Sequence, residues 1–370
     1  MANSNLTNAK KAKNDEFYTQ YHDIEKEIQA YIDFNPDVFR GKTVLLPCDD
    51  PEWSNFTKFF AQNFAVFGLK KLISTSFAAE SKSYKSDYQP TLFEMNDAQF
   101  DKKKTTKNGK IFTLTHDKTG DGKTNVEDLE WQYLKGDGDF KSDEIKKLRD
   151  EADIIITNPP FSLFRDFLGW IVEADKQFVI IGSMNAITYK EVFPLIKTNK
   201  MWLGNGFHAG NAFFSSPFAK EYADGIYDSK TGLVKFRNVC WFTSIDHGRR
   251  HQSLPLMTME ENLKYSKHKE IKGKAAYDHY DNYNAIEVPF TDSIPSDYYG
   301  IMAVPISFLD KYSPEQFEIL GVTQRNDDPY KIKQYTKEDY SNANDLNARG
   351  VIVVNGRPKA MYARVLIKKI

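Results

Sequence analysis

The stretch Ala152-Asp153-Ile154-Ile155-Ile156-Thr157-Asn158-Pro159-Pro160-Phe161 decides the fold. Its run of isoleucines, bounded by turn-forming residues, predicts a short strand that is buried on both faces of a parallel sheet. The two prolines end this strand, because proline cannot donate a hydrogen bond to a neighbouring strand. We therefore expect a rigid loop at the carboxyl end of a central strand, which is where open α/β sheets bind their ligands.

The loop carries groups suited to an amine on a planar ring. Asn158 and Pro159 supply two hydrogen-bond acceptors on a stiff backbone, and Phe161 supplies an aromatic face. Accepting both N–H bonds of such an amine turns its lone pair away from the ring. The pattern resembles motif IV, (Asp/Asn/Ser)-Pro-Pro-(Tyr/Phe/Trp), of the amino-methyltransferases that use S-adenosylmethionine. The alternative is a coil segment that carries Pro-Pro by chance, which the preceding strand pattern disfavours.

Composition bounds the class of protein. The chain has 370 residues, of which 41% are hydrophobic and 27% charged, so one large or two ordinary globular domains are expected. The net charge of −1 means that any binding to nucleic acid must come from local basic patches. The two cysteines, Cys48 and Cys240, form no Cys-x-x-Cys pair, so neither a disulfide framework nor a metal site is expected. With no signal-like or membrane-length apolar segment, the protein is predicted to be cytoplasmic, without a membrane partner.

A βαβ unit precedes the central strand. Residues 41–47 and 70–77 have strand patterns, and between them a helix is predicted from phenylalanines at helical spacing, capped by Ser54 or Asn55 and ended by Gly68. The loop after the first strand, Cys48-Asp49-Asp50, is the expected cofactor site. Its acidic residues suit an ammonium group and ribose hydroxyls, and helix capping is an equally open role. The loop lacks the glycines that methyltransferases usually have there.

The remaining elements complete an α/β pattern. Thr19 is a candidate N-cap for a helix through Ile24, Ile28 and Ile32, and residues 80–130 have the character of an insertion with a strand at 110–115 and a turn at 117–123. Asp139 and Phe140 follow a glycine turn and offer a hydrogen bond and a ring to an adenine, or simply form the turn. Further patterns predict helices at 142–151 and 163–171, a strand at 177–183, and an antiparallel edge hairpin from 200–205 and 237–245.

The chain becomes basic and tyrosine-rich after about residue 247. Arg249, Arg250 and His251 begin this region, and further lysines alternate with tyrosines up to Tyr283. Basic residues with interspersed aromatic ones favour a nucleic-acid surface. They are also common on solvated faces, and the sequence alone leaves both interpretations open.

Together these segments resemble an adenine-N6 DNA methyltransferase, and more narrowly the EcoRI-type modification methylase family. The resemblance covers nearly the whole chain, and the glycine-free Cys-Asp-Asp-Pro loop is itself a mark of that family. The segments that carry it are DEFYTQY from Asp15, CDDPEWSNF from Cys48, GDGDF from Gly136, NPPF from Asn158, WLGNG from Trp202, NVCWFTSIDH from Asn238 and PISFLDKYSPEQFEILG from Pro305.

The resemblance implies a fold and assigns separate functions to two parts of the chain. The fold would be a Rossmann-like S-adenosylmethionine-dependent methyltransferase sheet, with an antiparallel edge hairpin and a C-terminal α+β target-recognition region. Residues 1–248 would form the catalytic domain, with the insertion at about 80–130. Residues 249–370 would recognise double-stranded DNA, on which the protein would act as a monomer. A cognate restriction endonuclease is a possible partner.

The resemblance also assigns roles to the candidate residues. The target adenine would be flipped out of the duplex, because its amine cannot reach the cofactor within the base stack. The residues implied for catalysis are Asn158, Pro159, Pro160 and Phe161. Those implied for binding S-adenosyl-L-methionine are Tyr18, Thr19, Cys48, Asp49, Asp50, Asp139 and Phe140. Those implied for binding DNA are Arg249, Arg250 and His251.

Two other functions fit parts of the pattern. One is an amino-methyltransferase that acts on an RNA base or on a protein glutamine, since related Asn-Pro-Pro motifs serve those substrates. The other is a catalytically silent DNA-binding protein that keeps the fold, which an assay of S-adenosylmethionine binding would distinguish. A cytosine-C5 methyltransferase is excluded, because Pro47-Cys48 is not followed by Gln and no Glu-Asn-Val is present.

Overall fold

The chain forms two compact units in a computed structural model that describes residues 17–47, 49–51, 54–78, 97–207, 211–216, 219–324, 328–338 and 340–370. The first unit comprises residues 1–183 and 203–247, and the second comprises 184–202 and 248–370. A boundary therefore falls at 247–248. Residues 184–202, which the sequence analysis placed in the catalytic domain, belong to the second unit.

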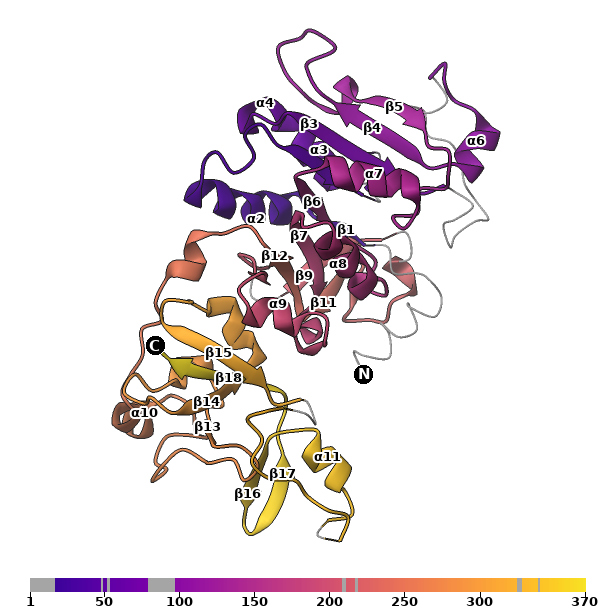
Figure 1. Ribbon diagram of the computed structural model, residues 1–370. Helices are drawn as coiled ribbons and strands as arrows, with labels where there is room; N and C mark the ends of the chain where they lie inside the picture. The colour runs from indigo at the N-terminus through magenta and orange to yellow at the C-terminus, as the bar shows by residue number, and fades with distance from the viewer. Residues whose placement is uncertain are drawn as a thin grey trace. The chain divides into compact units, whose positions relative to one another are not determined.

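The first unit is built around an eight-stranded sheet of order β5-β4-β3-β2-β6-β7-β12-β8 (Figure 1). Its inner strands β3, β2, β6 and β7 are parallel, and β4, β5 and β12 extend the sheet in antiparallel fashion. The strands are β2 (Thr43–Leu46), β3 (Lys71–Ser76), β4 (Lys110–Leu114), β5 (Glu130–Tyr133), β6 (Ile154–Thr157), β7 (Gln177–Ser183), β8 (Trp202–Leu203) and β12 (Val239–Thr243).

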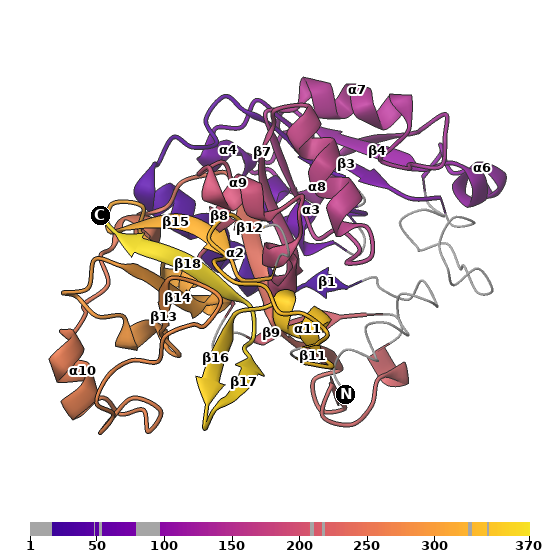
Figure 2. The ribbon, with the colours of Figure 1, turned by 60° about the horizontal axis from the view of Figure 1, so that its bottom comes forward.

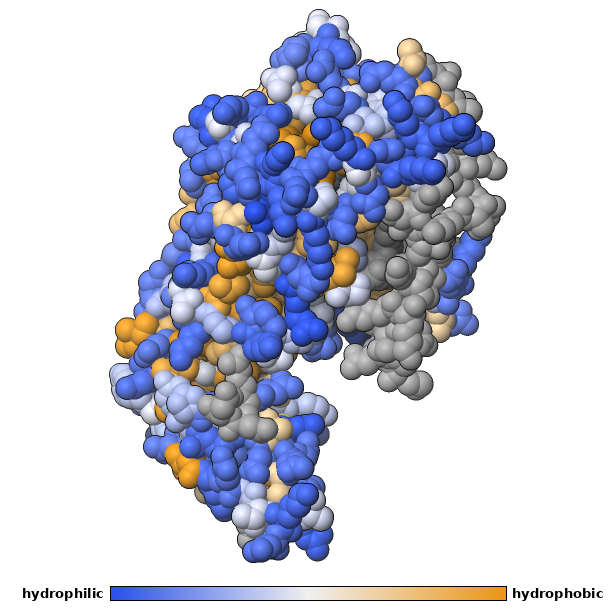
Figure 3. All heavy atoms as spheres, turned by 45° about the vertical axis from the view of Figure 1, so that its right-hand side comes forward, coloured by the Kyte–Doolittle hydropathy of each residue, from blue (hydrophilic) through white to orange (hydrophobic). Residues whose placement is uncertain are grey.

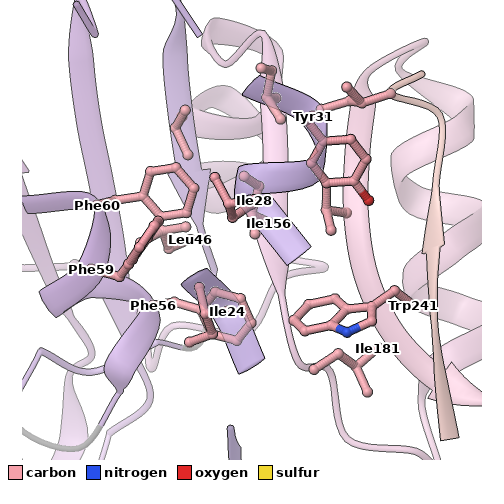
Figure 4. Packing of buried hydrophobic residues seen from close by; sticks show 14 of the residues in the cluster. Ile24, Ile28, Tyr31, Leu46, Phe56, Phe59, Phe60, Ile156, Ile181 and Trp241 are labelled. Carbon is pink, nitrogen blue, oxygen red and sulfur yellow. The ribbon is translucent and has the colours of Figure 1, made fainter. Parts of the chain in front are cut away.

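Helices cover both faces of this sheet. Trp241 and Phe242 are consecutive in β12 and point to opposite faces. Trp241 contacts Phe56 of α3 (Asn55–Gln62), whereas Phe242 contacts Phe164 of α8 (Phe164–Glu173). The other α-helices among the described residues of the first unit are α2 (Tyr21–Phe34), α4 (Phe64–Phe67), α6 (Lys102–Lys107) and α7 (Asp143–Glu151). Figure 4 shows the α2–α3 side, where helix side chains meet those of the strands.

Two of the predicted helix-end signals are confirmed: the Ser54 hydroxyl accepts from the Phe56 amide, and Gly68 ends α4 in the left-handed conformation at φ 63°. Ser142, which was expected as the first residue of a helix, is the N-cap of α7. The predicted cap at Thr19 is wrong. Gln20 occupies the N-cap position of α2, and Thr19 instead belongs to β1 (Tyr18–Thr19) because that segment pairs with another strand.

Part of the predicted insertion is an integral part of the sheet. The residues described in this region form α6, β4, the 3₁₀ turn Val126–Asp128 and β5, and β4 pairs with β3. The turn at 117–123 is held by carboxylates: Asp117 accepts from the amides of Gly120 and Gly122, and Asp128 from those of Lys118 and Thr119. Because β4 pairs with both β3 and β5, the hairpin of β4 and β5 extends the main sheet.

The predicted edge hairpin is only partly correct. β8 and β12 are neighbours at the sheet edge, as expected. They are not consecutive, because the chain between them contributes β9 (Asn211–Ser215), β10 (Tyr227–Asp228) and β11 (Leu233–Arg237) to a second sheet of order β1-β9-β11-β10. This second sheet brings the segment around Tyr18 into the first unit.

The second unit contains a four-stranded sheet of order β13-β14-β18-β15 and a separate hairpin (Figure 2). In the hairpin, Asn355 and Gly356, both with positive φ, form the turn between the strands β16 (Val351–Val354) and β17 (Arg357–Ala360). The other elements are β13 (Ala285–Glu287), β14 (Ile301–Pro305), β15 (Phe317–Val322), β18 (Arg364–Lys369), α9 (Phe193–Lys197), α10 (Met259–Tyr265) and α11 (Ala343–Asn347).

Hydrophilic residues predominate on the face drawn in Figure 3, where apolar groups form small separate patches. That surface agrees with a composition that is 27% charged. No helix in the described ranges is long and apolar enough to span a bilayer.

Candidate active site

The site lies at the topological switch point of the eight-stranded sheet, where successive strands are added on opposite sides. From β2 the chain adds β3 on one side, whereas from β6 it adds β7 on the other, so β2 and β6 flank the switch point. All four residues of each strand are buried. The Thr157 hydroxyl at the end of β6 donates to the Pro47 carbonyl after β2, at 3.0 Å. Loops from both strands are thereby held together at the edge where α/β sheets bind ligands.

Asp49 is fixed in the loop after β2. Its Oδ1 accepts from the Ser54 hydroxyl at 2.8 Å, and its backbone carbonyl accepts from the hydroxyls of Thr57 and Ser74. The side chain is buried, and burial raises its pKa to about 7 against the opposing effect of the Ser54 hydrogen bond. Asp49 is therefore a carboxyl group that changes charge near neutral pH.

Asn158 is oriented by the backbone of an N-terminal residue. Its side-chain nitrogen donates to the Phe17 carbonyl at 2.6 Å. A carbonyl oxygen accepts only from the NH₂ end of an amide, so this bond fixes which end of the side chain is which. The Asn158 Oδ1 atom is then left buried and without a hydrogen-bond partner among the described residues.

The segment Phe17–Thr19 completes the site from the second sheet. Thr19 pairs with Phe214 in β9, and its carbonyl accepts from the Asn55 side chain at 2.7 Å. These two contacts tie β1 both to the second sheet and to α3. The hydroxyl of Thr19 is buried and has no partner in the described chain.

A cleft brings these groups together. The residues that line it are Phe17, Tyr18, Thr19, Asp49, Asp50, Ser54, Phe56, Ser76, Phe77, Phe140, Asn158, Pro160, Leu163 and Phe167. Among the described residues, three of its buried polar atoms lack partners: Thr19 Oγ1, Asp49 Oδ2 and Asn158 Oδ1. An unsatisfied buried polar group costs about 1–3 kcal/mol, so three in one cleft indicate a polar ligand.

Seven of the predicted site residues line this cleft: Tyr18, Thr19, Asp49, Asp50, Phe140, Asn158 and Pro160. Pro159, Phe161 and Asp139 do not line it, and Cys48 lies outside the described residues. The Oδ1 atom of Asp139 accepts from the Lys141 amide at 2.9 Å, which is the turn role that the sequence left open.

Phe161 packs into an aromatic cluster next to the cleft. Its ring stacks on Phe17, with the ring centroids 5.8 Å apart and the planes at 29°. Its edges meet Phe214 and Phe236, both at 6.4 Å between centroids. Phe17 therefore contacts the motif twice, through its carbonyl to Asn158 and through its ring to Phe161.

The loop before Phe140 approaches the end of β3 closely. Gly138 has φ 92°, and a Cβ atom there would lie 2.4 Å from the Ser76 carbonyl oxygen. Only glycine fits this combination of conformation and contact. Phe140 is thereby placed beside the cleft, where its ring packs on Phe167 at 4.9 Å between centroids.

Several lining residues were not singled out as functional in the sequence. Ser76 and Phe77 end β3, so the rule that ligands bind at strand ends would have indicated them. Leu163 and Phe167 were assigned only to a helix face. Phe17 had no sequence signal, because its contribution to Asn158 is a backbone carbonyl.

The basic cluster is engaged within the second unit. Arg249 pairs with Asp310 at 2.5 Å, and His251 lies 2.7 Å from Glu315. Arg250 is buried, stacks over the Trp202 ring at 4.0 Å and donates to Asn199. These contacts give the three side chains a structural role, and their predicted contact with DNA stays a prediction.

The described residues contain no group of three or more His, Cys, Asp or Glu side chains arranged to hold a metal ion. The cleft is instead a polar and aromatic site at the switch point of an α/β sheet. That arrangement suits a ligand with hydrogen-bonding groups and a planar ring.

The comparisons with known proteins identify the family. The model of the adenine-specific methyltransferase EcoRI family matches residues 5–370, and the chain belongs to this family. It is 41% identical over 321 residues to the type II methyltransferase M.EcoRI of Escherichia coli, covering 86% of this chain and 89% of that one. It is 34% identical over 373 residues to the type II methyltransferase M.MgeORF184P of Mycoplasma genitalium, and 31% over 366 residues to M.MpnI of Mycoplasma pneumoniae. Each of these covers 98% of this chain and 97% of the relative, and no solved structure matches.

Asp49→Asn tests the buried carboxyl group. Because burial raises the folded-state pKa to about 7, Asp49 contributes stability that is present below about pH 4 and lost as the pH rises through 7. The asparagine variant lacks this loss, so its stability relative to the wild type should rise by a few kcal/mol between pH 4 and 8. Urea unfolding at several pH values measures the difference. A difference that is constant over this range would contradict the raised pKa.

Proposed function

We propose that the protein is a DNA methyltransferase that transfers a methyl group from S-adenosyl-L-methionine to N6 of an adenine flipped out of duplex DNA. It would be the modification half of a restriction–modification system, acting as a monomer. The observation that carries the proposal is the buried, unpaired Asn158 oxygen beside the cleft at the sheet's switch point. Membership in a family described as adenine-specific supports the choice of base.

The cleft residues fit the cofactor. Asp49 and Asp50 are acceptors suited to an ammonium group and to ribose hydroxyls, and the unpaired Thr19 hydroxyl can both donate and accept. Phe77 and Phe140 provide apolar walls for a base. When bound, S-adenosyl-L-methionine supplies an electrophilic methyl group on a sulfonium ion. Because ionised Asp49 favours a cationic ligand, we expect its pKa to fall on binding.

Asn158 and Pro159 hold the adenine amine. The Asn158 Oδ1 atom accepts one N–H bond, and the Pro159 carbonyl accepts the other. With both protons held, the nitrogen lone pair points out of the ring and can attack. Because the Phe17 carbonyl fixes the amide beforehand, little reorganisation is needed during the reaction. Pro160 keeps this corner rigid, and no covalent intermediate with the protein is required.

The role of Phe161 follows from its packing. The ring is held against Phe17 beside the corner that carries Asn158, and it is only partly buried. We assign the exposed part of this ring to stacking on the flipped adenine, which would otherwise lose its contacts with neighbouring bases. The second unit, with Arg249, Arg250 and His251, would supply DNA recognition.

The alternatives predict different products. A methyltransferase for RNA or for protein glutamine would use the same Asn158 geometry on another amine. A silent DNA-binding protein would not need unpaired acceptors in a buried cleft, which disfavours that alternative. Sequencing of plasmid DNA from cells that express the protein, with detection of modified bases, tests the proposal. Absence of N6-methyladenine, with methylation of an RNA or protein, would contradict it.

Asn158→Ala removes the proposed acceptor. Loss of one preorganised hydrogen bond at a reacting group typically costs about 10²-fold in turnover, so kcat should fall by at least about that factor. DNA affinity should change little, since most of it comes from contacts elsewhere. Single-turnover methylation with radiolabelled cofactor measures the rate. Near-normal turnover would show that the Asn158 oxygen does not hold the amine.

Asn158→Asp tests the nitrogen end of the amide, because it removes the NH₂ donor and keeps an acceptor oxygen. The motif resembled here admits Asp, but in this chain a carboxylate would face the Phe17 carbonyl without a proton to donate. The ratio of variant to wild-type turnover should therefore be about 10⁻² or lower at pH 8. It should rise as the pH falls and the carboxyl group becomes protonated. Wild-type turnover of this variant at pH 8 would mean that the Phe17 contact does not orient the residue.

A further inference from the structure

The hairpin β16–β17 is anchored at its base and exposed at its tip. At the base, the Val351 amide donates to Asn282 at 2.8 Å and the Val351 carbonyl accepts from the Asp281 amide. Val351 is fully buried with Tyr335, Ala343 and Leu346. Isolated two-stranded hairpins are marginally stable in water, so this anchoring is what holds the ribbon in place.

The tip exposes apolar side chains. Val353 is 53% exposed and Val354 is 44% exposed, and both belong to β16 next to the Asn355-Gly356 turn. Tyr362, which follows β17 at the base of the hairpin, is 82% exposed. Exposed apolar groups on a projecting ribbon indicate a surface that contacts a partner. Figures 1 and 2 show the hairpin extending from the body of the second unit.

The surrounding sequence is strongly cationic. No aspartate or glutamate occurs between Leu346 and Ile370, and the basic residues in this stretch are Arg349, Arg357, Lys359, Arg364, Lys368 and Lys369. The whole chain, by contrast, has a net charge of −1. Positive charge is therefore concentrated where the hairpin lies, which favours a polyanion as its partner.

The basic residues of the hairpin differ from those nearby in their ion pairing. Arg349 pairs with Asp345 at 3.1 Å, and Arg364 pairs with the buried Glu287 at 2.6 Å. The side chains of Arg357 and Lys359 make no ion pair or hydrogen bond with any residue that the structure describes. They are exposed, so their charge is available to a ligand.

Acidic groups near the base are largely neutralised. One side of the hairpin, with Val354 and Lys359, borders a hollow of about 270 Å³ in the second unit. Its acidic residues are Glu270, Asp278 and Glu287, of which Asp278 pairs with Lys274 at 2.7 Å and Glu287 with Arg364. The exposed end of the ribbon therefore keeps its positive character.

We propose that this hairpin enters the major groove of the target duplex and that Arg357 contacts a guanine edge there. The proposal rests on the proposed function in DNA methylation. The major groove is about 12 Å wide and admits a two-stranded ribbon, and arginine is the residue that most often reads guanine through O6 and N7. Val354, the cross-strand partner of Arg357, suits a thymine methyl group, and Lys359 suits a phosphate.

Substitutions of Arg357 and of Lys359 are expected to have different effects on DNA binding. Arg357→Ala should relax the methylated sequence at one G·C base pair, because a bidentate arginine–guanine contact discriminates by about 10-fold or more. Lys359→Ala should weaken binding equally for all sequences and reduce the salt dependence by about one counterion. Both residues are exposed, so the variants should fold normally, and unchanged S-adenosyl-L-methionine binding checks this.

The experiment sequences plasmid DNA methylated by each purified variant and measures duplex affinity at several salt concentrations. Arg40→Ala serves as the control arginine variant, because the exposed Arg40 pairs with Asp37 and precedes β2 at its amino end, whereas the cleft lies at the carboxyl end of that strand. Relaxation at one base pair in Arg357→Ala alone supports the proposal. An unchanged methylated context, or a uniform loss without relaxation, overturns the assignment of Arg357. If the wild type methylates no DNA, the proposed function itself fails, independently of the hairpin.

Discussion

The hydrogen bond from the Asn158 side chain to the Phe17 carbonyl is the contact on which the site depends. An asparagine at the end of β6 has two distinguishable ends, and only one of them suits an amine substrate. By occupying the nitrogen, Phe17 leaves the oxygen as a fixed acceptor. That oxygen is buried without a partner, which is costly in a folded protein and becomes useful only when a donor binds. The geometry is therefore prepared before any substrate arrives.

The fold makes this arrangement possible by converging on one edge. β2 and β6 end side by side, and the Thr157–Pro47 bond holds their loops together. The second sheet delivers Phe17 and Thr19 to the same place through β1. Asp49 is held by Ser54 at its carboxyl group and by Thr57 and Ser74 at its backbone carbonyl, so α3 with its N-cap and β3 together fix this residue. A cleft with this many supporting contacts resembles the rigid frames that enzymes use for positioning.

The sequence predicted the central strand and the helix ends well, but it did not predict the pairing of distant strands. The isoleucine run and the double proline placed β6 and its loop, and serine and glycine signals placed helix ends, because these effects are local. The pairing of β1 with β9 and of β4 with β3 depends on contacts between distant segments. Thr19 was therefore mistaken for a cap, and the pairing of β4 with the main sheet was not predicted.

The same distinction applies to the site. Asp49, Asp50 and Asn158 were predicted because they follow buried strands, and the structure brings them to one cleft. The role of Phe17 could not be predicted, because its contact with Asn158 is made by a backbone carbonyl, which every residue type has. The intramolecular partners of Arg249, Arg250 and His251 were equally hidden, since Asp310, Asn199 and Glu315 are more than 50 residues away.

A crystal structure of the protein with duplex DNA and a non-reactive S-adenosyl-L-methionine analogue tests the central claim most directly. The account predicts that the Asn158 nitrogen still donates to the Phe17 carbonyl while its oxygen accepts from the amine of an adenine outside the helix. An adenine bound elsewhere, or an Asn158 side chain turned so that its oxygen faces Phe17, would contradict it.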